Sequence, residues 1–193
     1  RYAVSEKFRP WAPDRAEDPP VVDESVDELD SDDDYAILSS YGEPSWASTT
    51  IPVFGATGNG WQAAISRWPT VEFQFVNAKP AVGIQISGYD DLGSACGLSS
   101  FSYDGAGVME SCTIEISTRH EALGCGSEAD TVSHEVGHCI GIFKHTRDGG
   151  LMDDTAQHSR TITGPVKTMI GLLYALPPGT DISADVTVLR SGI

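Results

Sequence analysis

Three histidines and one glutamate, residue types that can support metal chemistry, gather within the twelve residues from His134 to His145. The first part follows the pattern H-E-x-x-H, formed by His134, Glu135 and His138. On a helix, positions i and i+4 lie on one face, so these two histidines can present their imidazoles to one metal ion. Glu135 lies beside them and can act as general base toward a water on that metal. The pattern predicts metal-assisted hydrolysis, with a zinc peptidase as the first interpretation.

A metal ion held by two histidines lacks a stable set of protein ligands, so a third ligand must come from elsewhere in the chain. Gly141 indicates how, because a glycine can end the helix in a left-handed conformation and turn the chain back. His145 follows soon after that turn, and we expect it to be the third ligand. His158 and Asp148 are the alternatives. The thermolysin-like class, which takes a glutamate from a later helix, is excluded because no glutamate follows Glu135.

A Gly/Asp-rich segment over residues 148–153 carries Met152 shortly after the third histidine. With this segment, the sequence resembles the metzincin superfamily of zinc metallopeptidases. The signature of that superfamily is H-E-x-x-H-x-x-G-x-x-H, followed by a turn that bears a methionine beneath the metal. The resemblance implies one catalytic zinc ion and a Met-turn at Met152, although methionine is also a common filler of protein cores.

The upstream sequence looks like the matrixin-type branch of this superfamily. Residues 61–68 resemble its first helix, residues 73–76 its second strand, and residues 104–107 its calcium-loop region. The resemblance extends over about residues 50–176. It implies that calcium could bind as a second cofactor, with Asp90, Asp91 and Asp104 in suitable loops. It also implies that residues after Met152 line the pocket just beyond the scissile bond.

One position departs from the family pattern. The family spacing places the third ligand at position 144, which is Lys144, whereas the histidine is His145. We expect the turn after Gly141 to absorb the additional residue, so that His145 still reaches the metal. The branch also carries a structural zinc site with a histidine in its edge strand. Residues 108–111 contain no histidine, so we expect no such site.

The elements that must position these residues follow from hydrophobic periodicity. Alternation of apolar and polar residues predicts strands over 50–54, 71–76, 82–86 and 113–116. Helical spacing predicts helices over 60–68 and 166–176, and the H-E-x-x-H helix is expected to begin after Ser127 or Asp130 and to end at Gly141. Residues 87–111 are expected to form loops around one or two short strands. This order predicts an α/β (α+β) fold, and the resemblance implies a twisted mixed sheet with an active-site helix and a small irregular C-terminal lobe that ends in a helix.

Residues 1–45 differ in composition from the rest of the chain. This segment is rich in acidic residues and contains four of the eleven prolines before position 21. It offers few apolar side chains for a core, so we interpret it as a tail, a linker or the remnant of a pro-segment. The predicted peptidase domain covers residues 46–193, with an upper lobe over 46–141 and a lower lobe over 142–193.

The charge balance limits the partners of the chain. With 28 acidic against 12 basic residues, the formal net charge is −16. That charge argues against nucleic acid and anionic membrane surfaces as partners. We expect a monomer whose protein or peptide substrate lies extended along an edge strand, somewhere within residues 97–111.

Four cysteines are present, at positions 96, 112, 125 and 139, and none form a C-x-x-C pair. Two disulfides and a secreted, oxidising location are the favoured interpretation, and four buried thiols are the alternative. From proximity in the sequence we expect Cys125 to pair with Cys139, and Cys96 with Cys112. We expect His120 to be a solvated loop residue.

Two other functions stay open at this point. The chain could be a zinc-stabilised binding or adhesion module that the altered spacing before His145 has made inactive. It could also be a latent zymogen in which residues 1–45 block the cleft. An active or latent peptidase is favoured, because a binding module has no structural need for Glu135.

Overall fold

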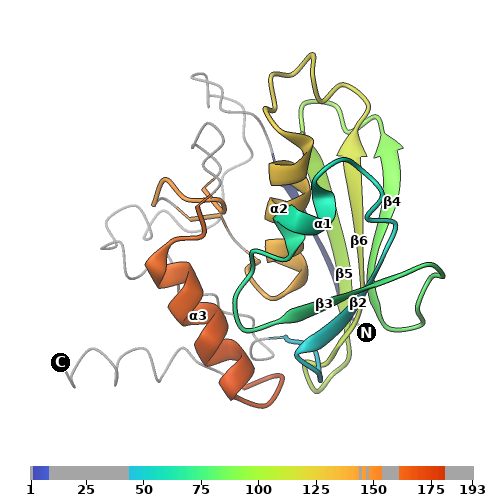
Figure 1. The fold of residues 1–193 in the computed structure, drawn as a ribbon. Helices are drawn as coiled ribbons and strands as arrows, with labels where there is room; N and C mark the ends of the chain where they lie inside the picture. The colour runs from blue at the N-terminus through green and yellow to red at the C-terminus, as the bar shows by residue number, and fades with distance from the viewer. Residues whose placement is uncertain (1, 9–43, 144, 147, 154–160, 181–193) are drawn as a thin grey trace.

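A mixed β-sheet with helices packed on one face forms the frame of the protein (Figure 1). The computed structural model describes residues 2–8, 44–143, 145–146, 148–153 and 161–180. Five strands from the central part of the chain lie in the order β5-β6-β4-β2-β3, and β1 adds a sixth strand beside β5. The strands are β1 (Tyr2–Phe8), β2 (Thr50–Phe54), β3 (Glu72–Val76), β4 (Gly83–Asp90), β5 (Gly97–Tyr103) and β6 (Met109–Ser117). This arrangement confirms the predicted α/β class.

Alternating apolar residues build the buried face of the sheet. Val53, Ile84, Cys112 and Phe101 are direct partners across four neighbouring strands, and all four are at most 2% exposed. β5 pairs antiparallel with β6, whereas β3, β2, β4 and β6 run parallel. The residues predicted to be loops around one or two short strands therefore contain the end of β4, all of β5 and the start of β6.

Helices α1 (Trp61–Ile65) and α2 (Glu128–Cys139) pack against each other next to the sheet. The indole of Trp68 donates a hydrogen bond of 2.9 Å to the Ser133 carbonyl, and the Ser133 hydroxyl donates one of 3.0 Å to the Ala64 carbonyl. Arg67 pairs with Asp130 at 2.7 Å. The helix predicted over 60–68 is thus shorter than expected, because its last residues form a turn whose side chains bind α2.

Helix α3 (Gly164–Ala175) lies on the side of α2 that faces away from the sheet (Figure 1), close to the helix predicted over 166–176. Tyr174 donates a hydrogen bond of 3.1 Å from its hydroxyl to the Ile140 carbonyl at the end of α2. Leu173 covers Gly141 so closely that a Cβ there would lie 2.4 Å from a Leu173 methyl carbon. α3 therefore covers the C-terminal end of α2. Within the described ranges, no helix combines the length and apolar character needed to cross a membrane.

The four cysteines form two disulfides, but the predicted pairing is wrong. Cys96 bonds to Cys125, and Cys112 bonds to Cys139. Cys125 precedes α2 while Cys139 ends it, and a helix of twelve residues is about 18 Å long, so these two residues cannot meet. The observed bonds instead attach the loop before α2 to the start of β5, and the end of α2 to β6. Two disulfides indicate an oxidising compartment.

Strand β1 was not predicted from the sequence. Its seven residues pair antiparallel with the whole of β5, from Tyr2 opposite Tyr103 to Phe8 opposite Gly97. The rest of the acidic segment, residues 9–43, lies outside the described residues, and so do the alternatives offered for it. The division into an upper and a lower lobe stays a prediction.

Removing either disulfide should destabilise the protein by a similar amount. The sequence separations are 29 residues for Cys96–Cys125 and 27 for Cys112–Cys139. Because the chain entropy released by losing a disulfide depends on loop length, each double Cys→Ala variant should lose about 3 to 4 kcal/mol of unfolding free energy. Urea titration of both variants and the wild type would measure this. Wild-type stability in either variant would contradict the prediction.

Candidate metal centre

Helix α2 carries polar side chains into the interior of the protein. Its first turn contains Glu128 and Asp130, whose negative charges are favourable at a helix N-terminus. Ser127, one of the two expected caps, occupies the N-cap position, but within the described part of the chain its side chain makes no capping hydrogen bond. Further along, His134, Glu135 and His138 are each at most 1% exposed. Burying polar side chains costs free energy unless they have hydrogen-bonding partners, and such groups are often kept for a function. Helix α2 therefore carries the candidate functional site.

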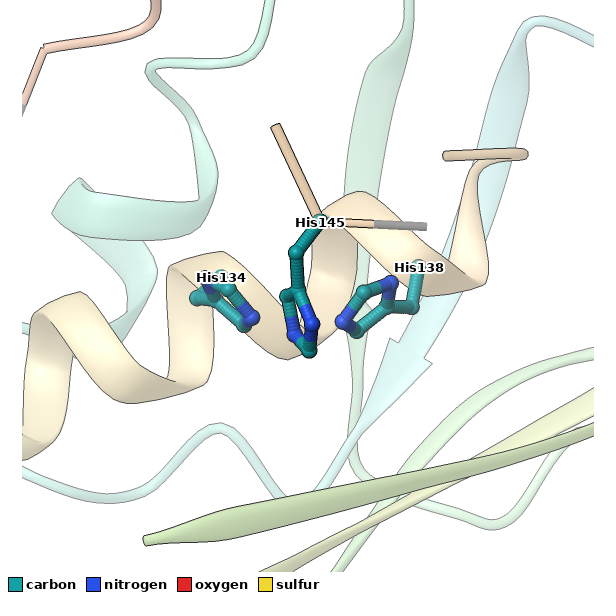
Figure 2. Close-up of side chains that lie close together, drawn as sticks. All are labelled: His134, His138 and His145. Carbon is teal, nitrogen blue, oxygen red and sulfur yellow. The ribbon is translucent and has the colours of Figure 1, made fainter. Parts of the chain in front are cut away.

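The three predicted histidine ligands come together (Figure 2). His134 and His138 project from α2, and His145 reaches them from the segment after the helix. The ring centroids are 4.9 Å apart for His134 and His138, and 5.1 Å apart for each of these rings and His145. One ligand nitrogen of each lies within 4.8 Å of the other two. Three imidazole nitrogens this close could hold one metal ion between them.

Two carbonyl groups fix the orientation of the helical histidines. His134 donates from Nδ1 to the Leu151 carbonyl at 2.6 Å, and His138 donates from Nδ1 to the Ile142 carbonyl at 2.5 Å. A carbonyl oxygen can only accept, so the proton of each neutral ring is on Nδ1 and Nε2 keeps its lone pair. The His138 Nε2 atom is buried, and among the described residues it has no hydrogen-bond partner. This tautomer, with Nδ1 bound to a carbonyl, is the one that ligates a metal through Nε2.

Burial keeps these histidines neutral. The pKa of His138 falls from 6.5 to about 3, first through desolvation by burial and then through the nearby His145. The pKa of His134 also falls well below its usual value, first through burial and then through the charges of His138 and His145. A metal ligand must be unprotonated, so both side chains are in the ligating state at neutral pH without any metal.

Gly141 turns the chain back as predicted. Its φ of 116° lies in the region that favours glycine. The Ile142 N–H binds the Gly137 carbonyl at 3.1 Å, and the Gly141 N–H binds the His138 carbonyl at 3.2 Å. These two bonds form a Schellman motif, which ends the helix and satisfies its last carbonyls. The same turn brings the Ile142 carbonyl to His138. The turn that ends the helix therefore also orients one of the histidine side chains.

The turn with Met152 lies directly against α2. Met152 is 1% exposed, and a Cβ at Gly137 would lie 2.3 Å from its sulfur, so the helix needs a glycine at this contact. The Met152 carbonyl accepts a hydrogen bond of 2.9 Å from the Thr146 N–H, next to His145. This turn therefore supports two histidines, through the Leu151 carbonyl and through Thr146.

Asp148, the alternative ligand that the structure describes, is not part of the cluster. Asp148 is occupied within the turn, where its carboxylate accepts from the Thr146 hydroxyl at 2.7 Å, from the Gly150 N–H at 3.0 Å and from the Thr163 hydroxyl. His158 and Lys144 lie outside the described residues. Among the described residues, the group with ligand spacing for a metal is His134, His138 and His145.

The prediction for His120 is wrong. Its side chain is 4% exposed, and Nε2 lies 2.9 Å from the Thr131 hydroxyl of α2. The loop that carries it is held inward by the Cys96–Cys125 disulfide, because the Cys125 N–H binds the His120 carbonyl at 3.2 Å. A pattern based on residue type could not show this burial, since it depends on a disulfide to a distant strand.

In the predicted calcium loops, the aspartate side chains accept hydrogen bonds from backbone N–H groups of the same loops. Asp104 accepts hydrogen bonds of 2.8 and 3.0 Å from the N–H groups of Ala106 and Val108. Asp90 and Asp91 bind nearby N–H groups in the same way. Calcium binding stays a prediction.

Sequence reasoning missed Ser99, which contacts the predicted base. Its hydroxyl donates to the Glu135 backbone carbonyl at 3.0 Å and to a carboxylate oxygen of the same residue. The alternation of β5 could have placed Ser99 on its inner face, but not opposite Glu135.

Fold and site together define an α/β protein with a three-histidine cluster on and after one helix, in which His134 and His138 are buried and His145 is half-buried, a group suited to a metal ion. The chain matches no protein-family model, and no curated protein matches its sequence.

The metal-free protein should lose stability as the pH falls. Unfolded His138 takes up a proton near pH 6.5, whereas the folded side chain stays neutral down to about 3. The unfolded state therefore binds more protons between these values, and stability present above 6.5 is lost as the pH falls through this range. From pH 7 to pH 5 this side chain should lower the unfolding free energy by about 2 kcal/mol. Urea titration of chelator-treated protein at both pH values would measure the loss.

The His138→Gln variant is the control, because glutamine does not titrate. The loss between pH 7 and pH 5 should be smaller in the variant than in the wild type. An equal loss in both proteins would show that His138 does not contribute.

Proposed function

We propose that the chain is a zinc-dependent endopeptidase of the metzincin superfamily, similar to its matrixin branch. The observation that carries the proposal is the convergence of His134, His138 and His145, with Glu135 next to the first ligand in the same buried helix turn. The Schellman turn at Gly141 and the contact of Met152 with α2 are two further features that this superfamily combines with such a site. The sheet, the helix after it and the C-terminal helix support the same assignment.

Each residue has a role in peptide-bond hydrolysis under this proposal. His134, His138 and His145 would hold zinc through ring nitrogens. Zinc, when bound, lowers the pKa of a water molecule and polarises the scissile carbonyl. Glu135 would take the proton of the attacking water on its carboxylate and return it to the leaving amine.

The substrate would be an extended protein or peptide segment paired with β5. This strand is next to α2, and its outer edge carries an antiparallel strand, β1, in the structure. Backbone pairing at such an edge binds peptides with little demand on sequence. We infer a secreted protein that acts as a monomer and has neither nucleic acid nor membranes as partners, from the two disulfides and the net charge of −16.

The Glu135→Gln variant separates chemistry from metal binding. It should keep stoichiometric zinc and wild-type stability, and its kcat on a denatured protein such as casein should fall at least about 100-fold, because the base is lost while the ligands remain. The His145→Ala variant should instead lose zinc affinity. Zinc content by atomic absorption, together with chelator-sensitive cleavage, would measure both effects.

Equal hydrolysis by wild type and Glu135→Gln would contradict the proposal. Stoichiometric zinc without chelator-sensitive cleavage would instead favour the zinc-stabilised binding module.

A latent form is a second candidate, and β1 is the observation that favours it. The backbone of residues 2–8 occupies the full length of the β5 edge, with Glu6 opposite Ser99 and Lys7 opposite Leu98. Ser99 in turn contacts Glu135. An extended substrate would need this same edge, so β1 and substrate would compete for it.

Disrupting the pairing of β1 should increase activity if the chain is latent. Ser5→Pro combined with Glu6→Pro removes two adjacent N–H groups, of which one must point toward β5 because these groups alternate along a strand. The variant should have a lower KM for peptide substrates than the wild type, by about tenfold if β1 contributes 1.4 kcal/mol to occupying the edge. Ser5→Ala with Glu6→Ala is the matched control, since it keeps both N–H groups. The same KM in both double variants would rule out latency through β1.

A further inference from the structure

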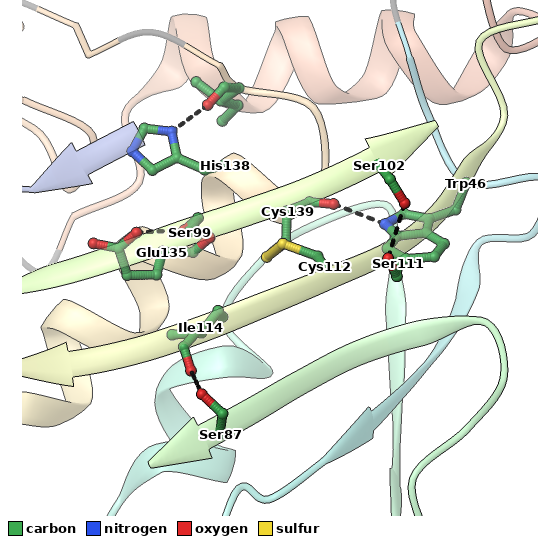
Figure 3. The surroundings of a disulfide bond; sticks show 11 residues. Trp46, Ser87, Ser99, Ser102, Ser111, Cys112, Ile114, Glu135, His138 and Cys139 are labelled. Carbon is green, nitrogen blue, oxygen red and sulfur yellow. Dashed lines mark hydrogen bonds between the residues drawn. A yellow bond between two sulfur atoms is a disulfide. The ribbon is translucent and has the colours of Figure 1, made fainter. Parts of the chain in front are cut away.

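Strand β5 contacts the carboxylate of Glu135 through Ser99 (Figure 3). Gly97 and Ser99 are two residues apart on this strand, so both face α2, and both are buried. Glu135 lies against them with 0% exposure. Two elements distant in sequence, β5 and α2, therefore determine together where this carboxylate lies.

Ser99 contacts Glu135 twice. Its hydroxyl lies 3.0 Å from the Glu135 backbone carbonyl and within hydrogen-bond distance of the carboxylate oxygen Oε2. The one proton of this hydroxyl is shared between the backbone carbonyl and the carboxylate, so Ser99 links the flexible end of Glu135 to the backbone of the same residue. Ser99 is 0% exposed, so water does not compete for this hydroxyl.

Gly97 leaves the space that the carboxylate fills. A Cβ at this position would lie 2.5 Å from Glu135 Oε1 and 2.9 Å from its Cγ. The glycine is not required by its backbone, because its φ does not lie in the left-handed region. Space for the Glu135 side chain is therefore the reason that this position has no side chain.

We propose that Ser99 and Gly97 are positioning residues for Glu135. Ser99 selects one rotamer by binding Oε2, and Gly97 leaves the space that this rotamer needs. The proposal rests on the proposed function, in which Glu135 moves a proton between water and the leaving amine. Glutamate has three rotatable side-chain bonds, and a base displaced by about 1 Å can cost a hundredfold in rate. Contacts that fix the carboxylate before the substrate binds should therefore increase kcat.

The Ser99→Ala variant tests the hydrogen bond. We expect kcat to fall about 10-fold to 100-fold while KM and zinc content stay within twofold of the wild type. The Ser99→Thr variant keeps the hydroxyl and should recover most of the lost kcat. Ser87→Ala is the control, because it also removes a serine hydroxyl that donates to a backbone carbonyl. Ser87 on β4 donates to the Ile114 carbonyl on β6 at 3.2 Å. The kinetics of this control variant should match the wild type.

Crystal structures of the same variants give a second readout that needs no activity. In the wild type and Ser99→Thr, one Glu135 rotamer should be seen with Oε2 on the hydroxyl. In Ser99→Ala and in Gly97→Ala, the carboxylate should move or occupy several positions. If Gly97→Ala does not fold, the two Ser99 variants still decide the outcome.

Three results would overturn the proposal. One is an unchanged kcat in Ser99→Ala, and another is an unchanged Glu135 rotamer in its crystal structure. A third is a Ser99→Thr variant as slow as Ser99→Ala, which would assign the effect to packing. These results leave the proposed function intact as long as Glu135→Gln abolishes hydrolysis. If the wild type does not hydrolyse peptides, the proposed function fails, and the crystal structures alone decide whether Ser99 positions Glu135.

Discussion

The hydrogen bonds from His134 and His138 to two backbone carbonyls are the constraint on which the rest of the site depends. Each bond places the ring proton on Nδ1 and presents Nε2 to the shared centre. The carbonyls belong to Ile142 and Leu151, so the chain after α2 must return to the helix twice. The first return is the Schellman turn, and the second is the turn with Met152. A helix with the same H-E-x-x-H residues but without these returns would have buried imidazoles with no fixed orientation.

Burying this helix is costly, and the surrounding contacts offset the cost. The lowered pKa of both histidines shows how strongly the interior disfavours their charged forms. Each neutral hydrogen bond returns only about 1 kcal/mol. The Cys112–Cys139 disulfide and the close contact of Gly137 with Met152 hold the helix between the sheet and the return segment. Natural proteins retain such energetically costly buried polar groups at functional sites, where the groups are needed for binding or catalysis.

The sequence predicts the parts of the site that depend on local patterns. Helical spacing predicted that His134 and His138 lie on one face, and Gly141 indicated the turn after the helix. The need for a third ligand indicated His145, which the structure brings to the other two histidines. Disulfide pairing could not be derived from proximity along the chain, although the length of α2 already forbids Cys125 from reaching Cys139. The contact of Ser99 with Glu135 depends on which strand lies under which turn of the helix, and neither periodicity nor motif spacing carries that information. The same holds for His120 and for the pairing of β1 with β5.

The residues on each side of position 144 are held by contacts within the described part of the chain. Before this position, Ile142 is held by the Gly137 carbonyl and by His138, and the ring of Phe143 stacks on Phe101 of β5 at 4.6 Å. After it, the Thr146 N–H binds the Met152 carbonyl. These contacts lie before and after position 144, and none of them depends on the number of residues between them. The direction of the chain at Gly141 and the anchor at Met152 therefore matter more for bringing His145 to the cluster than the residue count of the motif.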